Sequence, residues 1–298
     1  MSDKPPRYAS WTHGKLPLPE LAEMKRRGEK IVMVTAYDAP SARLADEAGV
    51  DMILVGDSSG MVVHGRESTV PVTMEEIVLM TQWVVRGAKR PIVVADMPFG
   101  SYEASDEEAV RNAVRLVKEG GADVVKVERG GTSVARARAI VDAGVGVMGH
   151  VGLTPQTSTL LGGFKAQGRS VDQARRVYDE ALALGAAGCF AIVLEAVPAP
   201  VAEAVTRALA VPTIGIGAGA ACDGQVLVWH DMLGFYQGQA PRFVKRYANL
   251  AAEITGALER YADEVRSGAF PEEQHTYAMP DEERKLFDAE LEEVREHH

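Results

Sequence analysis

The sequence is poor in cysteine, in basic charge and in long apolar runs. Its 298 residues include two cysteines, Cys189 and Cys222, which are far apart, so neither a disulfide framework nor a cysteine metal site is expected. Lysine and arginine number 32 against 42 acidic residues, and the net charge of -10 argues against a nucleic-acid-binding surface. No run approaches the length of a membrane span, and the first residues lack the apolar core of a signal peptide. These absences predict a cytoplasmic protein with neither a membrane nor a nucleic acid as partner.

Short apolar runs alternate with helical patterns along most of the chain. The predicted strands are Ile31–Thr35, Met52–Val55, Ile92–Ala95, Val124–Val127, Gly146–Met148, Phe190–Leu194, Thr213–Ile216 and Val226–Trp229. The predicted helices include Ala39–Ala48, Thr73–Gly87, Asp106–Glu119, Val134–Ala143, Val171–Leu184, Pro200–Leu209 and a last one from about Val244 to Val265. Eight strands alternating with helices predict an α/β fold, a single (β/α)8 TIM barrel. A doubly wound open sheet is the alternative that the same alternation permits.

Both ends of the chain lack this alternation of strands and helices. Residues 1–18 are polar and contain proline, and we expect an N-terminal arm, followed by a short helix over Glu20–Arg27 that leads into the barrel. The catalytic barrel is predicted to occupy residues 19–267 and a polar C-terminal extension residues 268–298. Within the extension, Asp281–Glu296 has the charge pattern of a solvated helix or a packing arm.

The predicted fourth strand carries two charges in a valine-rich run. Because side chains alternate along a strand, Lys126 and Glu128 share one face, while Val125 and Val127 share the other, which we expect to lie against helices. A buried charge must be paired or must bind a metal. The other interpretation is an edge strand whose charged face points to water.

Titratable side chains come at the ends of five successive predicted strands. They are Asp57, Asp96, Glu128, His150 and Glu195. Barrel active sites are built where strands end, so we expect these side chains to share one rim. Four carboxylates there would repel one another unless positive charge lies among them. Lys126 supplies one such charge, and a hard divalent cation, Mg²⁺ above all, would supply more.

Each of these residues also has a structural interpretation. Asp57, next to Ser58, is a good helix N-cap, and His150 is as consistent with a structural histidine as with one that orients a carboxylate or a water.

The glycine-rich stretch Gly215–Gly219 is typical of a tight turn rather than of a dinucleotide-binding loop. The stretch Leu161–Lys165 indicates a lid or a binding loop.

Many short motifs resemble those of one family, the ketopantoate (3-methyl-2-oxobutanoate) hydroxymethyltransferases. They are Thr35–Asp38, Val55–Ser58 with Gly60–Met61, Ala95–Phe99, Val125–Glu128, Gly149–Gln156, Gly162–Gly168, Leu194–Glu195, Gly215–Gly219, Asp223–Gln225 and His230–Asp231. The resemblance runs from about residue 19 to residue 275, and the tail beyond about 276 lies outside the shared pattern.

The resemblance implies a transferase of pantothenate and coenzyme A biosynthesis with a (β/α)8 fold. Such an enzyme transfers a hydroxymethyl group from 5,10-methylenetetrahydrofolate to 3-methyl-2-oxobutanoate through a Mg²⁺-stabilised enolate, which gives 2-dehydropantoate. It also implies self-association, with a homodecamer expected. By motif position, Asp57, Asp96 and Glu128 look like the metal group, and Glu195 looks like the catalytic base. Substrate contacts are implied for Asp57, Ser58, Asp96 and Lys126, with His150 in a supporting role.

Two other functions compete with this one. The phosphoenolpyruvate mutase and isocitrate lyase group also acts on 2-oxo acids with Mg²⁺ carboxylates on barrel strands, but it needs a reactive lid cysteine in a Lys-Lys-Cys-Gly-His motif. Neither Cys189 nor Cys222 has that context. A barrel that has lost catalysis and serves in binding or assembly is the other alternative, and the full set of rim charges argues against it.

Overall fold

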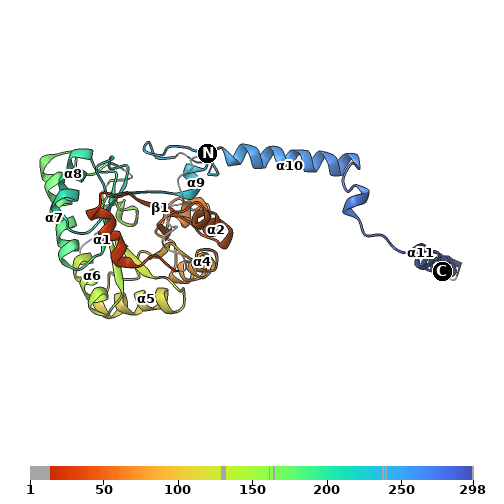
Figure 1. The fold of residues 1–298 in the computed structure, drawn as a ribbon, viewed down its shortest axis with the longest axis horizontal. Helices are drawn as coiled ribbons and strands as arrows, with labels where there is room; N and C mark the ends of the chain where they lie inside the picture. Colours follow the sequence, from red (N-terminus) through yellow and green to blue (C-terminus); the bar gives the residue numbers. More distant parts are fainter. Residues whose placement is uncertain are drawn as a thin grey trace. The chain divides into compact units, whose positions relative to one another are not determined.

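A computed structural model describes residues 14–128, 132–160, 162–163, 165–236, 238 and 240–296. Within these residues, eight parallel strands close into a barrel in which each strand pairs with its neighbours in chain order, and β8 pairs with β1 (Figure 1). The strands are β1 Ile31–Thr35, β2 Met52–Val55, β3 Ile92–Asp96, β4 Val124–Glu128, β5 Gly146–Gly152, β6 Ala191–Glu195, β7 Thr213–Ile216 and β8 Gly224–Leu227. The predicted TIM barrel is therefore confirmed, and the open sheet is excluded.

Helices surround the barrel and also follow it in the chain. Their bounds are α1 Leu18–Arg26, α2 Ala39–Glu47, α3 Ser59–Val62, α4 Met74–Gly87, α5 Asp106–Lys118, α6 Ser133–Asp142, α7 Val171–Ala186, α8 Ala199–Ala208, α9 Trp229–Met232, α10 Leu250–Ser267 and α11 Asp281–Glu296. Short 3-10 turns occur at Pro155–Thr157 and Glu273–His275.

The start of α4 shows why a helix begins where the sequence indicates. The Thr73 hydroxyl accepts a hydrogen bond from the amide of Glu76, and the Glu76 carboxylate accepts one from the amide of Thr73. This capping box satisfies two amides that the helix itself leaves without partners. Arg66 also pairs with Glu76, and this pairing lowers the pKa of the Glu76 carboxyl to about 2.

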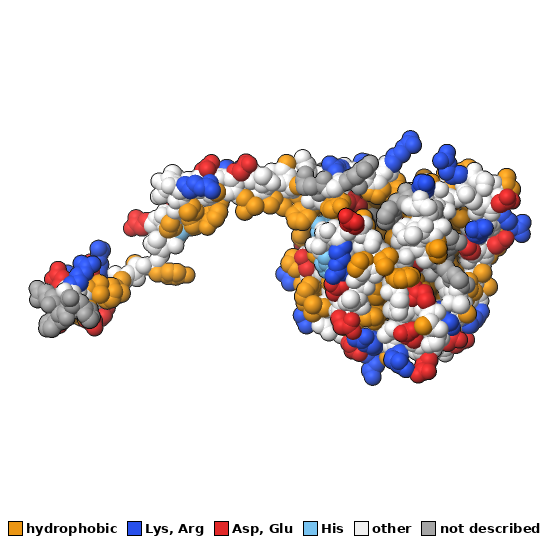
Figure 2. Space-filling view, turned by 180° about the vertical axis from the view of Figure 1, so that it is seen from behind, with side chains coloured by type: hydrophobic (Ala, Val, Ile, Leu, Met, Phe, Trp, Pro, Cys, Tyr) orange, Lys and Arg blue, Asp and Glu red, His pale blue; other side chains and the backbone are white. Residues whose placement is uncertain are grey.

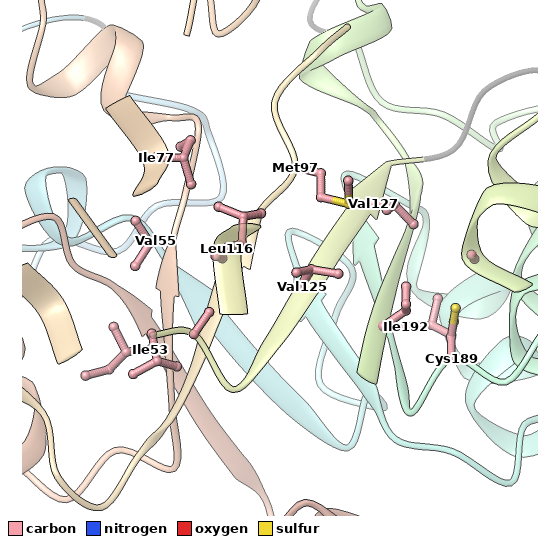
Figure 3. Packing of buried hydrophobic residues seen from close by; sticks show 14 of the residues in the cluster. Ile53, Val55, Ile77, Met97, Leu116, Val125, Val127, Cys189 and Ile192 are labelled. Atoms are coloured by element: carbon pink, nitrogen blue, oxygen red, sulfur yellow. The ribbon is translucent and has the colours of Figure 1, made fainter. Parts of the chain in front are cut away.

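Two apolar layers hold the barrel together. Strand residues that point outward pack against the helices, as Figure 3 shows for Val125 of β4 near Leu116 of α5. Cys189, which precedes β6, belongs to the same outer layer, and burial raises the pKa of its thiol to about 12. Inward-pointing residues, among them Val124 of β4, fill the barrel below the rim. This alternation leaves the last inward positions of each strand for the site.

Several predicted boundaries were wrong. β8 begins at Gly224 and ends at Leu227, not at Trp229, which starts α9 instead. A Cβ at Gly224 would lie 2.5 Å from the Ile31 carbonyl oxygen, so this strand starts with a glycine because β1 passes so close. The last predicted helix, from Val244, begins only at Leu250, and β5 continues past Met148 to Gly152. The four-residue helices α3 and α9 were not predicted, since such short helices leave little periodicity in the sequence.

The chain divides into two compact units, Met1–Ala248 and Asn249–His298. The predicted barrel segment extended to residue 267, so α10 lies in the second unit of this division. Most of the predicted N-terminal arm lies outside the described residues. Hydrophobic side chains gather along the helices of the second unit (Figure 2), including Ile254, Leu258 and Tyr261 of α10. Among the described residues, no helix has both the length and the hydrophobicity of a membrane span.

Candidate active site

The charged face of β4 lies inside the barrel, at its carboxyl-terminal end. Lys126 is paired in register with Asp96 of β3, and Glu128 is paired with His150 of β5. Lys126 and Glu128 are 4% and 2% exposed, and β4 has a neighbour on each side. The alternative of an edge strand that faces water is therefore wrong, and the predicted burial of the two charges is confirmed.

Lys126 is the positive centre of the cluster. Its Nζ lies 2.7 Å from Asp96 Oδ1 and 3.8 Å from Glu128 Oε1. Burial alone lowers the pKa of this ammonium group, but Asp96, Glu128 and Asp57 together raise it above its ordinary value. At neutral pH, Lys126 therefore carries a positive charge.

Asp57 follows β2, and its carboxylate points into the cluster. Its Oδ2 accepts a hydrogen bond of 2.9 Å from the side-chain amide of Gln156. The helix that follows, α3, has Ser58 at its N-cap position and no side-chain cap hydrogen bond, so Asp57 does not serve as the helix cap that the sequence suggested. Burial, together with the charges of Asp96 and Glu128, raises the pKa of the Asp57 carboxyl to about 8. Burial is the larger cause of this shift, and the neighbouring carboxylates add to it.

Asp96 is held against the loop after β2. Its Oδ2 accepts a hydrogen bond of 3.0 Å from the amide of Asp57, and burial raises the pKa of its carboxyl. A Cβ at Gly56 would lie 2.7 Å from Ser58 Oγ and 3.5 Å from Asp96 Oδ2, so glycine is what allows the loop to come this close. Ser58 Oγ in turn lies 2.9 Å from the hydroxyl of Tyr37.

His150 lies between two carboxylates. Its Nδ1 is 3.4 Å from Glu128 Oε1, and its Nε2 is 3.3 Å from Glu195 Oε2. Burial and the nearby Lys126 lower the pKa of the imidazole, but the two glutamates outweigh them and raise it to about 9. The raised pKa favours the protonated ring at neutral pH, and Lys126 Nζ lies 3.4 Å from the same Nδ1 that faces Glu128. The supporting role of His150 stays a prediction.

The predicted site residues meet at one cavity of about 600 Å³. Asp57, Ser58, Asp96, Lys126, Glu128, His150 and Glu195 all line it. Glu195 ends β6, and its side chain is 15% exposed, more than the other charges of the cluster. Gly152 of β5 lies opposite in register, and a Cβ there would come 2.3 Å from the Glu195 carbonyl oxygen. Backbone packing therefore fixes where Glu195 enters the cavity.

The family of the chain follows from comparison with known proteins. The model of the ketopantoate hydroxymethyltransferase family matches residues 15–273, which is most of the chain. The chain belongs to this family. The expected enzyme class, a transferase, is confirmed with it.

Curated relatives agree over nearly their whole length. The 3-methyl-2-oxobutanoate hydroxymethyltransferase of Moorella thermoacetica is 59% identical over 263 residues, which cover 88% of this chain and 98% of that protein. The enzyme of the same name from Nitratidesulfovibrio vulgaris is 53% identical over 290 residues and covers 96% of this chain and 94% of its own. The second match extends into the tail beyond residue 276, which was expected to lie outside the shared pattern and does lie beyond the family model.

Solved structures of other enzymes share the fold. Phosphonopyruvate hydrolase in complex with oxalate and Mg²⁺ has a TM-score of 0.55 at 14% identity, covering 94% of this chain and 98% of its own. 2,3-Dimethylmalate lyase, a member of the phosphoenolpyruvate mutase and isocitrate lyase superfamily, has a TM-score of 0.54 at 16% identity, covering 92% and 98%. At such low identity, these similarities establish the barrel architecture alone.

The donor set of this ketopantoate hydroxymethyltransferase family member fits a hard divalent cation. Around Lys126 and protonated His150, the cavity gathers the four predicted carboxylates, which leaves about two negative charges unbalanced when all are ionised. Oxygen ligands of this kind are those that Mg²⁺ prefers. The described residues contain no preformed cage of three or more His, Cys, Asp or Glu ligands, so substrate and water oxygens would complete the coordination. The assignment of Asp57, Asp96 and Glu128 as metal ligands stays a prediction.

Sequence reasoning missed two polar residues of the site. Gln156 and Tyr102 are both buried, and the Tyr102 hydroxyl donates a hydrogen bond of 2.7 Å to Gln156 Oε1. Gln156 belongs to a motif that carried the family resemblance, but it sits beyond the end of β5, where strand alternation predicts nothing. Its place in the motif Gly149–Gln156 was the signal that the sequence offered for Gln156.

Proposed function

We propose that this protein transfers a hydroxymethyl group to 3-methyl-2-oxobutanoate and forms 2-dehydropantoate, with 5,10-methylenetetrahydrofolate as donor and Mg²⁺ as cofactor. The observation that carries the proposal is the buried cluster in which Lys126 lies 2.7 Å from Asp96, at a cavity that Glu195 also lines. The relatives that are 50–59% identical bear the name of this activity.

The cluster offers what a 2-oxo acid requires. A cation held at Asp57 and Asp96 would act, when bound, as a Lewis acid on the keto oxygen. Lys126 neutralises the substrate carboxylate, and the Ser58 hydroxyl, held by Tyr37, orients it. Both groups are fixed before the substrate arrives, so little entropy is lost when it binds.

Glu195 is the base in this proposal. Its carboxylate takes the proton from C3 of the oxo acid, and the electron pair left on C3 attacks the methylene carbon of the donor. Over the whole reaction, both C–N bonds of the methylene carbon break, and water supplies the oxygen of the new hydroxyl group. The proton that Glu195 took and the two protons of the water end on the hydroxyl oxygen and on the two folate nitrogens, so that tetrahydrofolate leaves. His150 Nε2 lies 3.3 Å from Glu195 Oε2, so in this proposal the imidazole orients the base.

Hydrogen exchange separates the proton step from the transfer step. Wild-type protein with Mg²⁺ and 3-methyl-2-oxobutanoate in D2O is expected to exchange the C3 hydrogen without folate, as followed by proton NMR. Glu195→Gln is expected to lose exchange and turnover together, by at least the roughly 10²-fold typical of a removed general base. Glu203→Gln, on the outer helix α8, is the matched control and should exchange at the wild-type rate. Wild-type exchange in Glu195→Gln would assign the base elsewhere, with His150 as the next candidate.

The mutase and lyase alternative finds no support in the thiols. Cys189 and Cys222 are 1% and 0% exposed, and burial raises the pKa of both. Buried thiols of this kind are inert rather than catalytic. Assembly into a homodecamer and location in the cytoplasm are part of the same proposal, and sedimentation velocity on the full chain tests the first.

A further inference from the structure

Gln156 makes contact with three elements of the site at once. It lies in the 3-10 turn that follows β5 and is 4% exposed. Its backbone amide donates 3.0 Å to Glu128 Oε2, and its side-chain Nε2 donates 2.9 Å to Asp57 Oδ2. The same Nε2 donates 2.9 Å to the carbonyl oxygen of Met97, just after β3. Gln156, in the β5–α7 connection, thus contacts two carboxylates of the site: Asp57, which follows β2, and Glu128, which ends β4.

The neighbours of the Gln156 amide determine its orientation. The amide of Glu128 donates 3.2 Å to the Tyr102 hydroxyl oxygen, which leaves the hydroxyl proton for Gln156 Oε1 at 2.7 Å. If the amide were flipped, its oxygen would face the Asp57 carboxylate and the Met97 carbonyl, both of which can only accept. Every donor and acceptor of the side chain is therefore used, in one orientation, in a buried site where a lost hydrogen bond is costly.

We propose that Gln156 is a positioning residue: it sets the orientations of Asp57 and Glu128 and makes both depend on the placement of the β5–α7 connection. It acts through these carboxylates and does not touch the reacting atoms. The inference rests on the proposed function only where turnover is the readout.

Two substitutions separate positioning from simple packing. Gln156→Glu keeps the size and the acceptor for Tyr102 but presents an oxygen to Asp57 and Met97, whereas Gln156→Met removes all side-chain hydrogen bonds at similar volume. If Gln156 acts through its Nε2 donor, Gln156→Glu is at least as harmful as Gln156→Met. We expect both to lower kcat/KM for 3-methyl-2-oxobutanoate about 10- to 100-fold, the range for a lost buried hydrogen bond to a charged group, with a raised KM. A packing role predicts the reverse order, with Gln156→Glu the milder change.

A matched control and a structural readout complete the test. Thr206→Val removes the buried hydrogen bonds of Thr206 Oγ1 to Ala202 O and Thr213 Oγ1, away from the cavity. It should lower the melting temperature without changing KM or kcat. The crystal structure of Gln156→Met should show the Asp57 carboxylate turned from its wild-type orientation.

The outcomes are decisive whether or not the proposed function holds. An unchanged Asp57 carboxylate in the Gln156→Met crystal overturns the inference, as does a variant that melts lower with wild-type KM and kcat. Wild-type protein that does not turn over the oxo acid refutes the proposed function, and the crystal structures then decide the role of Gln156 alone.

Discussion

Replacing Lys126 by methionine tests the electrostatic account of the site most directly. Methionine keeps most of the volume but removes the cation that lies 2.7 Å from Asp96 and 3.8 Å from Glu128, among side chains that are at most 4% exposed. Removing one partner of a buried ion pair costs about 3–5 kcal/mol, because it leaves an uncompensated charge. With an unfolding entropy of about 2.1 cal/mol/K per residue, this corresponds to a melting temperature lower by roughly 5–8 °C.

The pH dependence of this loss has a definite sign. The pKa of Lys126 is raised above 10.5, so its stabilising contribution is complete at neutral pH and is lost only as the pH rises through the folded-state value. In Lys126→Met, by contrast, Asp96 and its neighbours take up protons as the pH falls, which removes the unpaired charge. The difference in unfolding free energy between wild type and variant should therefore be larger at pH 7 than at pH 5.

Urea denaturation in the presence of EDTA measures this difference, and a second series with Mg²⁺ measures compensation by the metal. Lys25→Met is the matched control, because Lys25 pairs with Asp223 at 2.8 Å, with side chains 16% and 14% exposed. Lys25→Met should lower the free energy of unfolding by less than Lys126→Met does, and Mg²⁺ should not reverse that loss. If Lys126→Met is as stable as wild type at pH 7 in EDTA, the carboxylates around it are not ionised in the folded protein, and the proposed balance of charges is wrong.

Three further changes have defined outcomes. Asp96→Asn keeps the shape of the side chain but removes a charge, and it should weaken Mg²⁺ binding at least about tenfold, or 1.4 kcal/mol, by calorimetry; unchanged affinity would remove Asp96 from the metal group. Glu76→Gln should lower the free energy of unfolding by about 1 kcal/mol at pH 7, because it weakens the α4 cap. The Arg66 contact lowers the pKa of Glu76 from 4.5 to about 2, so the stability difference between wild type and variant is present above pH 4.5 and should vanish as the pH falls through about 2. A constant difference down to pH 2 would contradict this. Gly152→Ala should lower kcat more than it lowers Mg²⁺ affinity, because its Cβ would displace the Glu195 backbone, and equal losses in both would indicate a general distortion of the rim.

Strand alternation and barrel topology account for the part of the site that the sequence predicts. Lys126 and Glu128 had to share a face, and the ends of parallel strands had to meet at one rim, so the meeting of Asp57 and Glu195 at one cavity follows from local pattern and fold alone. The gathering of carboxylates around Lys126 was predicted as well, whereas the raised pKa of Asp57, which burial causes first, needed the structure.

What could not be predicted depends on contacts between distant segments. Tyr102 and Gln156 lie in loops, whose path no periodicity fixes, and they meet across 54 positions of sequence. The first residues of β8, Gly224 and Gln225, have little intrinsic strand preference and become strand because they pair with Ile31 and Val32 of β1. The state of His150 also needed the structure, since two glutamates from neighbouring strands set it.

Chemical labelling of the two buried cysteines can report on local opening of the barrel. Cys189 precedes β6 and Cys222 precedes β8, and a thiol reagent can reach neither while the surrounding strands stay closed. Labelling rates in native buffer therefore measure the free energy of local opening on that side of the barrel, with no engineered probe. If ligands stabilise the rim, they should slow the labelling of both thiols, and the thiol that slows more shows which strands the ligand holds closed.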